Sequence, residues 1–218
     1  MDQLYDFLER LAANNTREWF AANKAEYQRL REAWLADLQK LINALAVYEP
    51  RLRHVDAKSC VYRIYRDTRF SPDKTPLKTY FSALISPQGR HCGDRACYYF
   101  HQGVDETALY GGLWCPQPPV LKKVRKAIID NVEEFRPLVE NPAVLEAYPQ
   151  WWGRQLKTAP KGYDRDHPDI DLLRLTEYGR CHNLDRDFFH RPDWHEEAAR
   201  IFALLKPMND FINYSIDE

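Results

Sequence analysis

Residues 63–80 hold the densest group of side chains in this chain that could do chemistry. Arg63, Arg66 and Arg69 are spaced three residues apart, and Lys74 and Lys78 follow them. A guanidinium is a planar fork that grips phosphate or carboxylate through two hydrogen bonds, whereas a lysine ammonium adds a point charge. The spacing therefore predicts a site for a multiply charged anion.

Two carboxylates interleave with these cations and leave a second interpretation open. Asp67 is expected to orient one guanidinium, and Asp73 to lie beside the same ligand. Alternatively, arginine–aspartate pairs lock the segment to its scaffold. Residues 51–80 carry eight Lys/Arg against three Asp, a net of +5, whereas residues 185–218 carry four Lys/Arg against eight Asp/Glu, a net of −4. The acidic C-terminal segment is thus a further internal partner for the arginines.

The same segment resembles a mostly bacterial family known as domain of unknown function 2461. Its signature is R-x-x-R-D-x-R-F followed by D/N-K-x-x-Y, and the matching residues are Arg63, Arg66, Asp67, Arg69, Phe70, Asp73 and Lys74. Leu77 stands where the signature has its tyrosine. Shorter likenesses occur at 15–20 (NTREWF), 111–114 (GGLW), 160–163 (PKGY), 166–168 (DHP) and 205–207 (LKP). The resemblance implies a place for the site and no particular activity.

A second polar cluster lies at residues 161–168, within an irregular stretch. Irregular segments of this length often carry function. Lys161 and Tyr163 would add ligand contacts, and His167 would act as an acid or base, where they face the arginine segment. The alternative is a solvated turn in which Asp166 or Asp169 caps a helix. His101 is the other candidate acid or base.

Histidines and cysteines do not have the spacing of a zinc site. Cys92 and Cys97 are separated by four residues, and no C-x-x-C pair occurs. Gly111-Gly112 lacks the context of a dinucleotide-binding or phosphate-binding loop. The sequence therefore predicts no metal and no cofactor.

Aromatic side chains near the basic segment raise the question of nucleic acid. Tyr98, Tyr99 and Phe100, with Tyr110 and Trp114, could stack bases, although such runs are more typical of a sheet core. No recognised nucleic-acid-binding pattern is present. Nucleic acid is therefore a less favoured partner than an anionic small molecule.

Composition sets the class of protein. The chain has 218 residues, 44% of them hydrophobic, and a net charge of −1, so it can bury a core and has no overall attraction to nucleic acid or an anionic membrane. The N-terminal residues do not resemble a signal peptide, and no apolar run reaches membrane-spanning length. Five irregularly spaced cysteines are typical of reduced thiols. We expect a single cytoplasmic domain over residues 1–218 with no membrane partner.

Hydrophobic periodicity predicts helices at both ends and strands in the middle. The expected strands are 60–65, 80–85, 97–101, 107–114 and 177–184. The expected helices are 4–11, 15–48, two stripes after Pro118, a turn within 169–175, and a closing helix from Trp194 that Pro207 divides. This predicts an α+β fold, with an antiparallel central sheet of about five strands covered by the N- and C-terminal helices.

Two functions follow from the sequence. The first is binding of a phosphorylated or otherwise anionic small ligand through the arginine-rich segment, with phosphoester transfer as the chemistry that would suit it best. The second is a non-catalytic interaction protein, in which the Arg/Asp cluster is a structural salt-bridge network and the partner is protein or nucleic acid. The residues leave open whether the protein is an enzyme.

Overall fold

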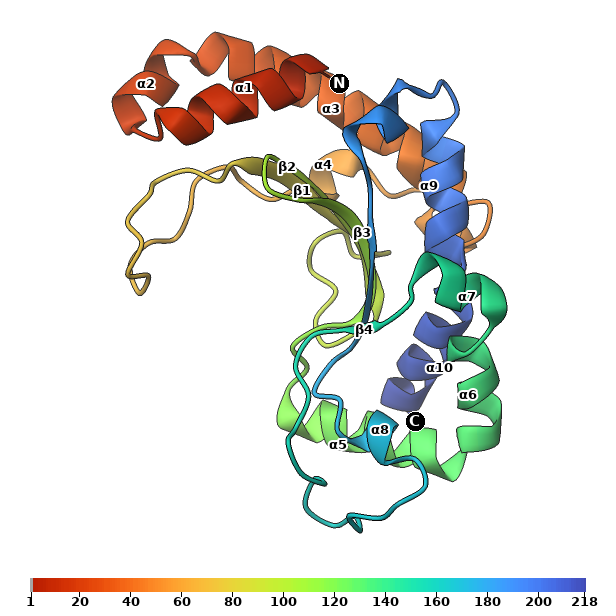
Figure 1. Cartoon of the computed structure of the whole chain (residues 1–218). Coiled ribbons are helices and arrows are strands. Elements are labelled where there is room, and N and C mark those ends of the chain that lie inside the picture. The colour runs from red at the N-terminus through yellow and green to blue at the C-terminus, as the bar shows by residue number, and fades with distance from the viewer. Residues whose placement is uncertain (1) are drawn as a thin grey trace. The chain divides into compact units, whose positions relative to one another are not determined.

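A five-stranded antiparallel sheet organises the chain (Figure 1). In this computed structural model, which describes residues 2–218, the strand order is β1-β2-β3-β5-β4. The strands are β1 (Tyr80–Ile85), β2 (Cys97–Gly103), β3 (Thr107–Leu113), β4 (Trp151–Trp152) and β5 (Tyr178–Asn183). The predicted α+β class and antiparallel sheet are confirmed, and β4 is the strand that periodicity missed because it has only two residues.

The chain divides into two compact units, which we describe separately. The first unit contains the residues up to His91, Tyr99–Leu109 and Asn183–Arg200, and the second contains Cys92–Tyr98, Tyr110–His182 and Ile201–Glu218. The helices are α1 (Asp2–Ala13), α2 (Arg17–Ala22), α3 (Lys24–Leu45), α4 (Ala57–Cys60), α5 (Pro118–Asp130), α6 (Val132–Val139), α7 (Pro142–Ala147), α8 (Ile170–Leu173), α9 (Trp194–Ala203) and α10 (Lys206–Asp217), with 3-10 turns at Pro50–Leu52 and Arg186–His190. The single domain over residues 1–218 stays a prediction.

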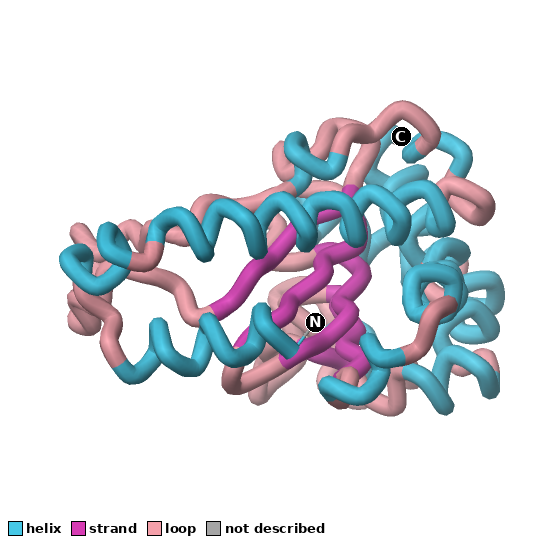
Figure 2. Tube along the Cα trace, turned by 90° about the horizontal axis from the view of Figure 1, so that it is seen from above, coloured by secondary structure: helices cyan, strands magenta, loops and turns pink. Residues whose placement is uncertain are grey.

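In the first unit, α1 and α3 lie along one face of β1 and β2 (Figures 1 and 2). Trp34 of α3 packs its ring on Phe81 and Phe100, with centroids 5.3 and 6.0 Å apart, and donates a hydrogen bond to the buried Gln102 side chain at 2.9 Å. Because side chains alternate along a strand, the neighbours of Phe81 and Phe100 point to the opposite face.

The predicted helix over 15–48 is two helices. Asn23, with φ −104° and ψ 11°, leaves the helical conformation and separates α2 from α3. The N-cap of α2 is Thr16, whose hydroxyl accepts from Trp19 N at 3.1 Å. Asn15 is occupied by a contact with a distant part of the chain, which local pattern could not reveal.

The predicted strand over 60–65 is wrong. Cys60 ends α4, and the following residues make only two isolated antiparallel bridges, Val61 with Ala83 and Tyr65 with Leu77. Between these bridges one side advances four residues and the other six, so two extra residues interrupt the ladder. The segment is extended and paired at its ends, but it does not form a continuous strand.

In the second unit, helices α5, α6 and α10 enclose a core with β5. The core includes Val124, Phe135, Tyr178, Leu205 and Ile212, each fully buried. The predicted strand over 177–184 and the division of the closing helix before Pro207 are both confirmed. Among residues 2–218, no helix is both long and apolar enough to cross a membrane.

A buried arginine holds two helix ends together in this second unit. Arg180 of β5 is 3% exposed, and its guanidinium donates to Val139 O at 3.1 Å and Tyr148 O at 2.9 Å. Val139 ends α6 and Tyr148 is the C-cap of α7, so the cation lies at the negative ends of two helices. Burial lowers the pKa of Arg180 to about 10. The Trp151 ring covers the guanidinium at 3.9 Å.

Replacing Arg180 should therefore destabilise the protein strongly. Arg180→Met leaves two helix-terminal carbonyls without their donor, and we expect a loss of about 2–5 kcal/mol in the free energy of unfolding by urea titration. Lys122→Met on the exposed face of α5 is the control and should stay within about 0.5 kcal/mol of wild type. A variant of Arg180 as stable as the control would rule out this role.

Candidate functional site

The basic loop, residues 61–79, is anchored to the N-terminal helices by one side chain. Asn15 Nδ2 donates to Leu77 O at 2.9 Å, and Asn15 Oδ1 accepts from Leu77 N at 3.1 Å, so the amide satisfies both backbone groups of a buried residue. Two further backbone bonds close the base of the loop, Arg66 N to Pro76 O at 2.9 Å and Lys78 N to Ile64 O at 2.8 Å. The positions of Arg63, Arg66 and Lys78 are thus fixed relative to β1.

The tip of the basic loop is braced by its own charges. Arg66 pairs with Asp73, and Arg69 makes a two-pronged pair with Asp67 at 3.0 and 2.7 Å. The Arg69 hydrogen bond lowers the pKa of Asp67 to about 2, while hydrogen bonds from Thr75 and Arg66 lower that of Asp73 further. These carboxylates stay ionised at neutral pH, so the tip is electrically nearly balanced.

Lys74 also stabilises the tip of the basic loop. Its Nζ donates to Thr68 O at 2.9 Å, across the turn that the two aspartates brace. The arginines' partners are therefore aspartates of the loop itself. Both pairs are solvent-exposed, so an anion could reach them. Each arginine would have to release its aspartate in order to bind that anion.

Two cations of the basic loop lack such a partner. Among residues 2–218, Arg63 and Lys78 make no ion pair with a carboxylate. Lys78 is half-buried, and this burial, with the nearby positive charge of Arg63, lowers the pKa of its ammonium. A partly desolvated ammonium without a counter-charge is costly unless an anion approaches it.

Two aromatic rings lie close to that ammonium, one from the basic loop and one from β1. Lys78 Nζ lies 5.3 Å from the Tyr62 ring centroid and 5.5 Å from that of Tyr80. Tyr80 packs against His101 with centroids 4.2 Å apart, and Tyr99 lies on the same face as His101, opposite the helices. We call this group the cationic–aromatic site; it consists of Tyr62, Arg63, Lys78, Tyr80, Tyr99 and His101.

His101 is the imidazole of this site. Its Nδ1 lies 3.3 Å from Tyr99 Oη, within hydrogen-bond distance. Burial lowers its pKa, an effect that Lys78 strengthens and Glu106 opposes. Burial also raises the pKa of Tyr99 to about 12, so the phenol keeps its proton. At neutral pH the pair consists of a neutral imidazole and a neutral phenol.

The other predicted site residues belong to the second unit, and the structure gives them local contacts. Tyr163 packs edge-on against His167 with centroids 6.2 Å apart. His167 Nδ1 accepts from Asp169 N at 3.0 Å, at the residue that begins α8. Lys161 is exposed in the same turn. These contacts favour the solvated-turn interpretation of the segment.

The structure also bears on the possible metal site and on the possible aromatic platform for nucleic acid. Within the described part of the chain, no three His, Cys, Asp or Glu side chains are grouped so that they could hold a metal ion. The expected aromatic platform divides between faces: Tyr98 and Phe100 are buried, whereas Tyr99 lies on the face of the cationic–aromatic site. Tyr110 and Trp114 both contact Trp152.

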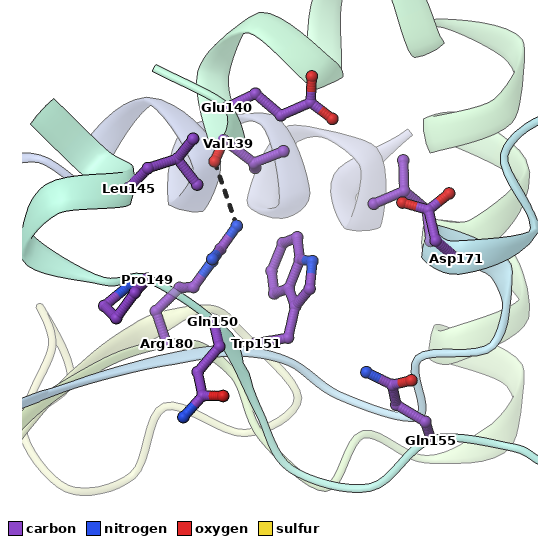
Figure 3. Close-up of a pocket in the computed structure, with 10 residues that line it drawn as sticks. Val139, Glu140, Leu145, Pro149, Gln150, Trp151, Gln155, Asp171 and Arg180 are labelled. Carbon is purple, nitrogen blue, oxygen red and sulfur yellow. Dashed lines mark hydrogen bonds between the residues drawn. The ribbon is translucent and has the colours of Figure 1, made fainter. Parts of the chain in front are cut away.

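A pocket of about 380 Å³ in the second unit is a further candidate (Figure 3). Arg180 and Trp151 line it, together with the carboxylates of Glu140 and Asp171. Both carboxylates pair with Arg136, at 2.6 and 2.7 Å, and the Arg180 guanidinium is occupied by helix carbonyls. Within residues 2–218, Arg180 has no carboxylate partner and its buried Nε has no hydrogen-bond partner, but its terminal nitrogens are held by the two helix carbonyls, so this pocket offers an incoming anion less than the cationic–aromatic site does.

Two aromatic residues of the site are not among those predicted from the sequence. Tyr80 and Tyr62 were assigned to strands, and no ligand role was expected for them. Tyr80 shares strand parity with Ser82, opposite the covered Phe81, so alternation within β1 could have placed it. Local sequence pattern could not have placed the Tyr62 side chain. The Tyr62 amide donates to Ser82 O at 3.1 Å, and the register of the pairing shifts beyond this bond.

Comparison with known proteins agrees with the motif. A family model described as "Conserved hypothetical protein (DUF2461)" matches residues 3–211. Searches of the curated proteins and of the solved structures each gave no match. The matched region contains the whole basic loop and both strands that carry the cationic–aromatic site. The chain therefore belongs to the DUF2461 family.

Proposed function

We propose that the cationic–aromatic site binds an anionic small molecule, with its phosphate or carboxylate group against Lys78 and Arg63. The observation that carries this proposal is the half-buried Lys78 ammonium, which has no carboxylate partner within the part of the chain that the structure describes. The other charged groups of the loop have partners at its tip. An incoming anion would supply the missing counter-charge and recover the free energy lost by partial desolvation.

The rings suggest what else the ligand carries. Tyr62, Tyr80 and Tyr99 lie at 38% exposure or less and present apolar faces beside the cations. A ligand that combines an anionic group with a flat or apolar body would use both features, because ring stacking and charge pairing add. Phosphorylated compounds with a ring fit this description best. Arg66, which stands near Tyr80, could exchange Asp73 for the ligand.

Removing the charge of Lys78 should weaken anion binding. We expect Lys78→Gln to lower affinity for pyrophosphate about 10- to 100-fold, since one charge-assisted hydrogen bond is lost. Isothermal titration calorimetry at two salt concentrations gives the measurement, and wild-type affinity should fall with salt. Lys24→Gln, on exposed α3, is the matched control.

The two variants separate the proposal from general electrostatics. Equal affinities for Lys78→Gln and Lys24→Gln would mean that the net charge, and not the site, governs binding. Absence of saturable binding to pyrophosphate and to ring-bearing phosphates in wild type would remove the proposal. Lys78→Arg tests geometry, because it keeps the charge but changes the donor arrangement.

Proton transfer at this site would fall to His101. A neutral imidazole beside an anion can accept a proton, as phosphoester chemistry would require. His167 is given no role at this site, because the side-chain contacts that the structure gives it are local to residues 163–169. The step from binding to catalysis is part of the proposal and depends on anion binding first.

The lowered pKa of His101 has a consequence for stability. In the pH range between its folded value and the ordinary value of about 6.5, the unfolded chain binds more protons than the folded chain, so stability falls as pH falls through this range. His101→Asn removes this contribution. Wild type should thus lose more unfolding free energy than the variant between pH 7.5 and 5.5 in urea titrations. A variant that loses as much as wild type would show that His101 has an ordinary pKa.

A second candidate function rests on Phe70. This ring is 93% exposed at the loop tip, beside Arg69, whose guanidinium lies 5.7 Å from its centroid. An exposed aromatic on a loop braced by ion pairs is typical of a contact surface for another macromolecule. In this interpretation the Arg/Asp pairs shape the tip and no small ligand is involved.

Site-specific cross-linking distinguishes this second function. A photoreactive amino acid at position 70 should give a discrete cross-linked product in cells that make the protein, because the ring would be buried on binding. The control position is Val47, which is 76% exposed on another surface. The same products, or none, from both positions would count against an interaction role for the tip.

A further inference from the structure

Two cysteines of the second unit face each other. Cys92 lies in the loop before β2 and Cys97 is its first residue, and their Sγ atoms are 3.5 Å apart. Both side chains are partly exposed. A disulfide bond measures about 2.05 Å, so small rotations of the side chains would bring the sulfurs to bonding distance.

The loop that carries the pair is fixed to the C-terminal helix. Arg95 makes two hydrogen bonds of 2.7 Å to the Asp217 carboxylate, and the Asn213 amide accepts from Ala96 N at 2.9 Å and donates to Ala96 O at 3.0 Å. Gly93, at φ +62°, supplies the turn. The two thiols therefore meet within an ordered turn.

The contact also divides the roles of the two thiols. Once Cys92 is ionised, its sulfur can only accept, so Cys97 Sγ–H donates to it. This hydrogen bond lowers the pKa of Cys92 to about 7 and raises that of Cys97. The thiolate is the reactive form of cysteine. Cys92 is suited to attack and Cys97 to resolve.

Cys115 provides an internal contrast. It is the exposed cysteine of the chain, but partial desolvation and its 3.4 Å contact with the Glu177 carboxylate raise its pKa. Exposure alone would make Cys115 the first thiol to react. The geometry of the pair favours Cys92 instead.

We propose that Cys92 and Cys97 form a redox-active dithiol that a hydroperoxide converts to an intramolecular disulfide. The Cys92 thiolate attacks the peroxide oxygen, the O–O bond breaks, and sulfenic acid and hydroxide form. Cys97 then attacks the sulfenic sulfur, an S–S bond forms, and water leaves. With hydrogen peroxide, two thiols and one peroxide give one disulfide and two waters. The proposal is independent of anion binding at Lys78.

Oxidation followed by peptide mapping tests it. The reduced full-length protein is treated with hydrogen peroxide at pH 7, remaining thiols are alkylated, and digested peptides are identified by mass spectrometry. The Cys92–Cys97 disulfide should form at least about fivefold faster than Cys115 loses its thiol. A larger thiolate fraction outweighs the lower nucleophilicity of an acidic thiol by roughly that factor.

Variants identify the order of events. In Cys97→Ser, sulfenic acid should persist on Cys92 and be trapped by dimedone, whereas Cys92→Ser should leave Cys97 slow to react. Cys115→Ser should oxidise at the wild-type rate. The proposal is overturned if Cys115 reacts first in wild type, or if no Cys92–Cys97 disulfide forms. Mapping of the wild type decides this even where a variant folds poorly.

Discussion

The proposed function of this protein depends on one side chain, the half-buried Lys78 ammonium. It lies close to aromatic rings and has no carboxylate partner among residues 2–218. Lys78 occupies that position because Asn15 fixes the backbone of Leu77, one residue earlier. The nearby charge of Arg63 adds to the positive field at Lys78, and Arg63 has no carboxylate partner among residues 2–218.

The signature arginines have different roles although they lie close together in sequence. Arg69 and Arg66 pair with Asp67 and Asp73 and give the loop tip its shape. Arg63 lies at the base, next to the half-buried lysine. Exposed ion pairs add little to stability, typically about 0–1 kcal/mol each, so their value lies in fixing the arrangement of the tip. The motif thus combines ion pairs at the tip with a cation at the base that has no carboxylate partner among residues 2–218, so one segment has features of a salt-bridge network and of an anion site.

Sequence patterns anticipated the regular elements and missed what depends on distant contacts. Alternation found β1 and the hairpin of β2 and β3, and Pro207 marked the division of the closing helix. The strand predicted from Cys60 failed because two extra residues on the 77–83 side shift the register between the Val61–Ala83 and Tyr65–Leu77 bridges, a feature that no local pattern carries. The role of Arg180 was hidden for the same reason, because its partners are carbonyls 32 and 41 residues away.

The candidate site, too, could be predicted from the sequence only where it depends on local pattern. Composition and spacing located the basic loop, but only the paired structure separates Arg63 and Lys78 from the cations that have partners. Strand alternation could predict the face on which His101 lies. His167 instead accepts a hydrogen bond from a neighbouring backbone amide. Pairing between charges cannot be derived from spacing alone, since Asp67 could have served any of three arginines.

NMR of the protein with labelled lysine side chains measures the pKa of Lys78, the property on which the proposed anion binding depends. We expect a value below the ordinary lysine value of about 10.4, because burial and the positive charge of Arg63 disfavour the ammonium. Addition of pyrophosphate should raise it, because the bound anion favours the charged form. An ordinary pKa that pyrophosphate leaves unchanged would contradict the account.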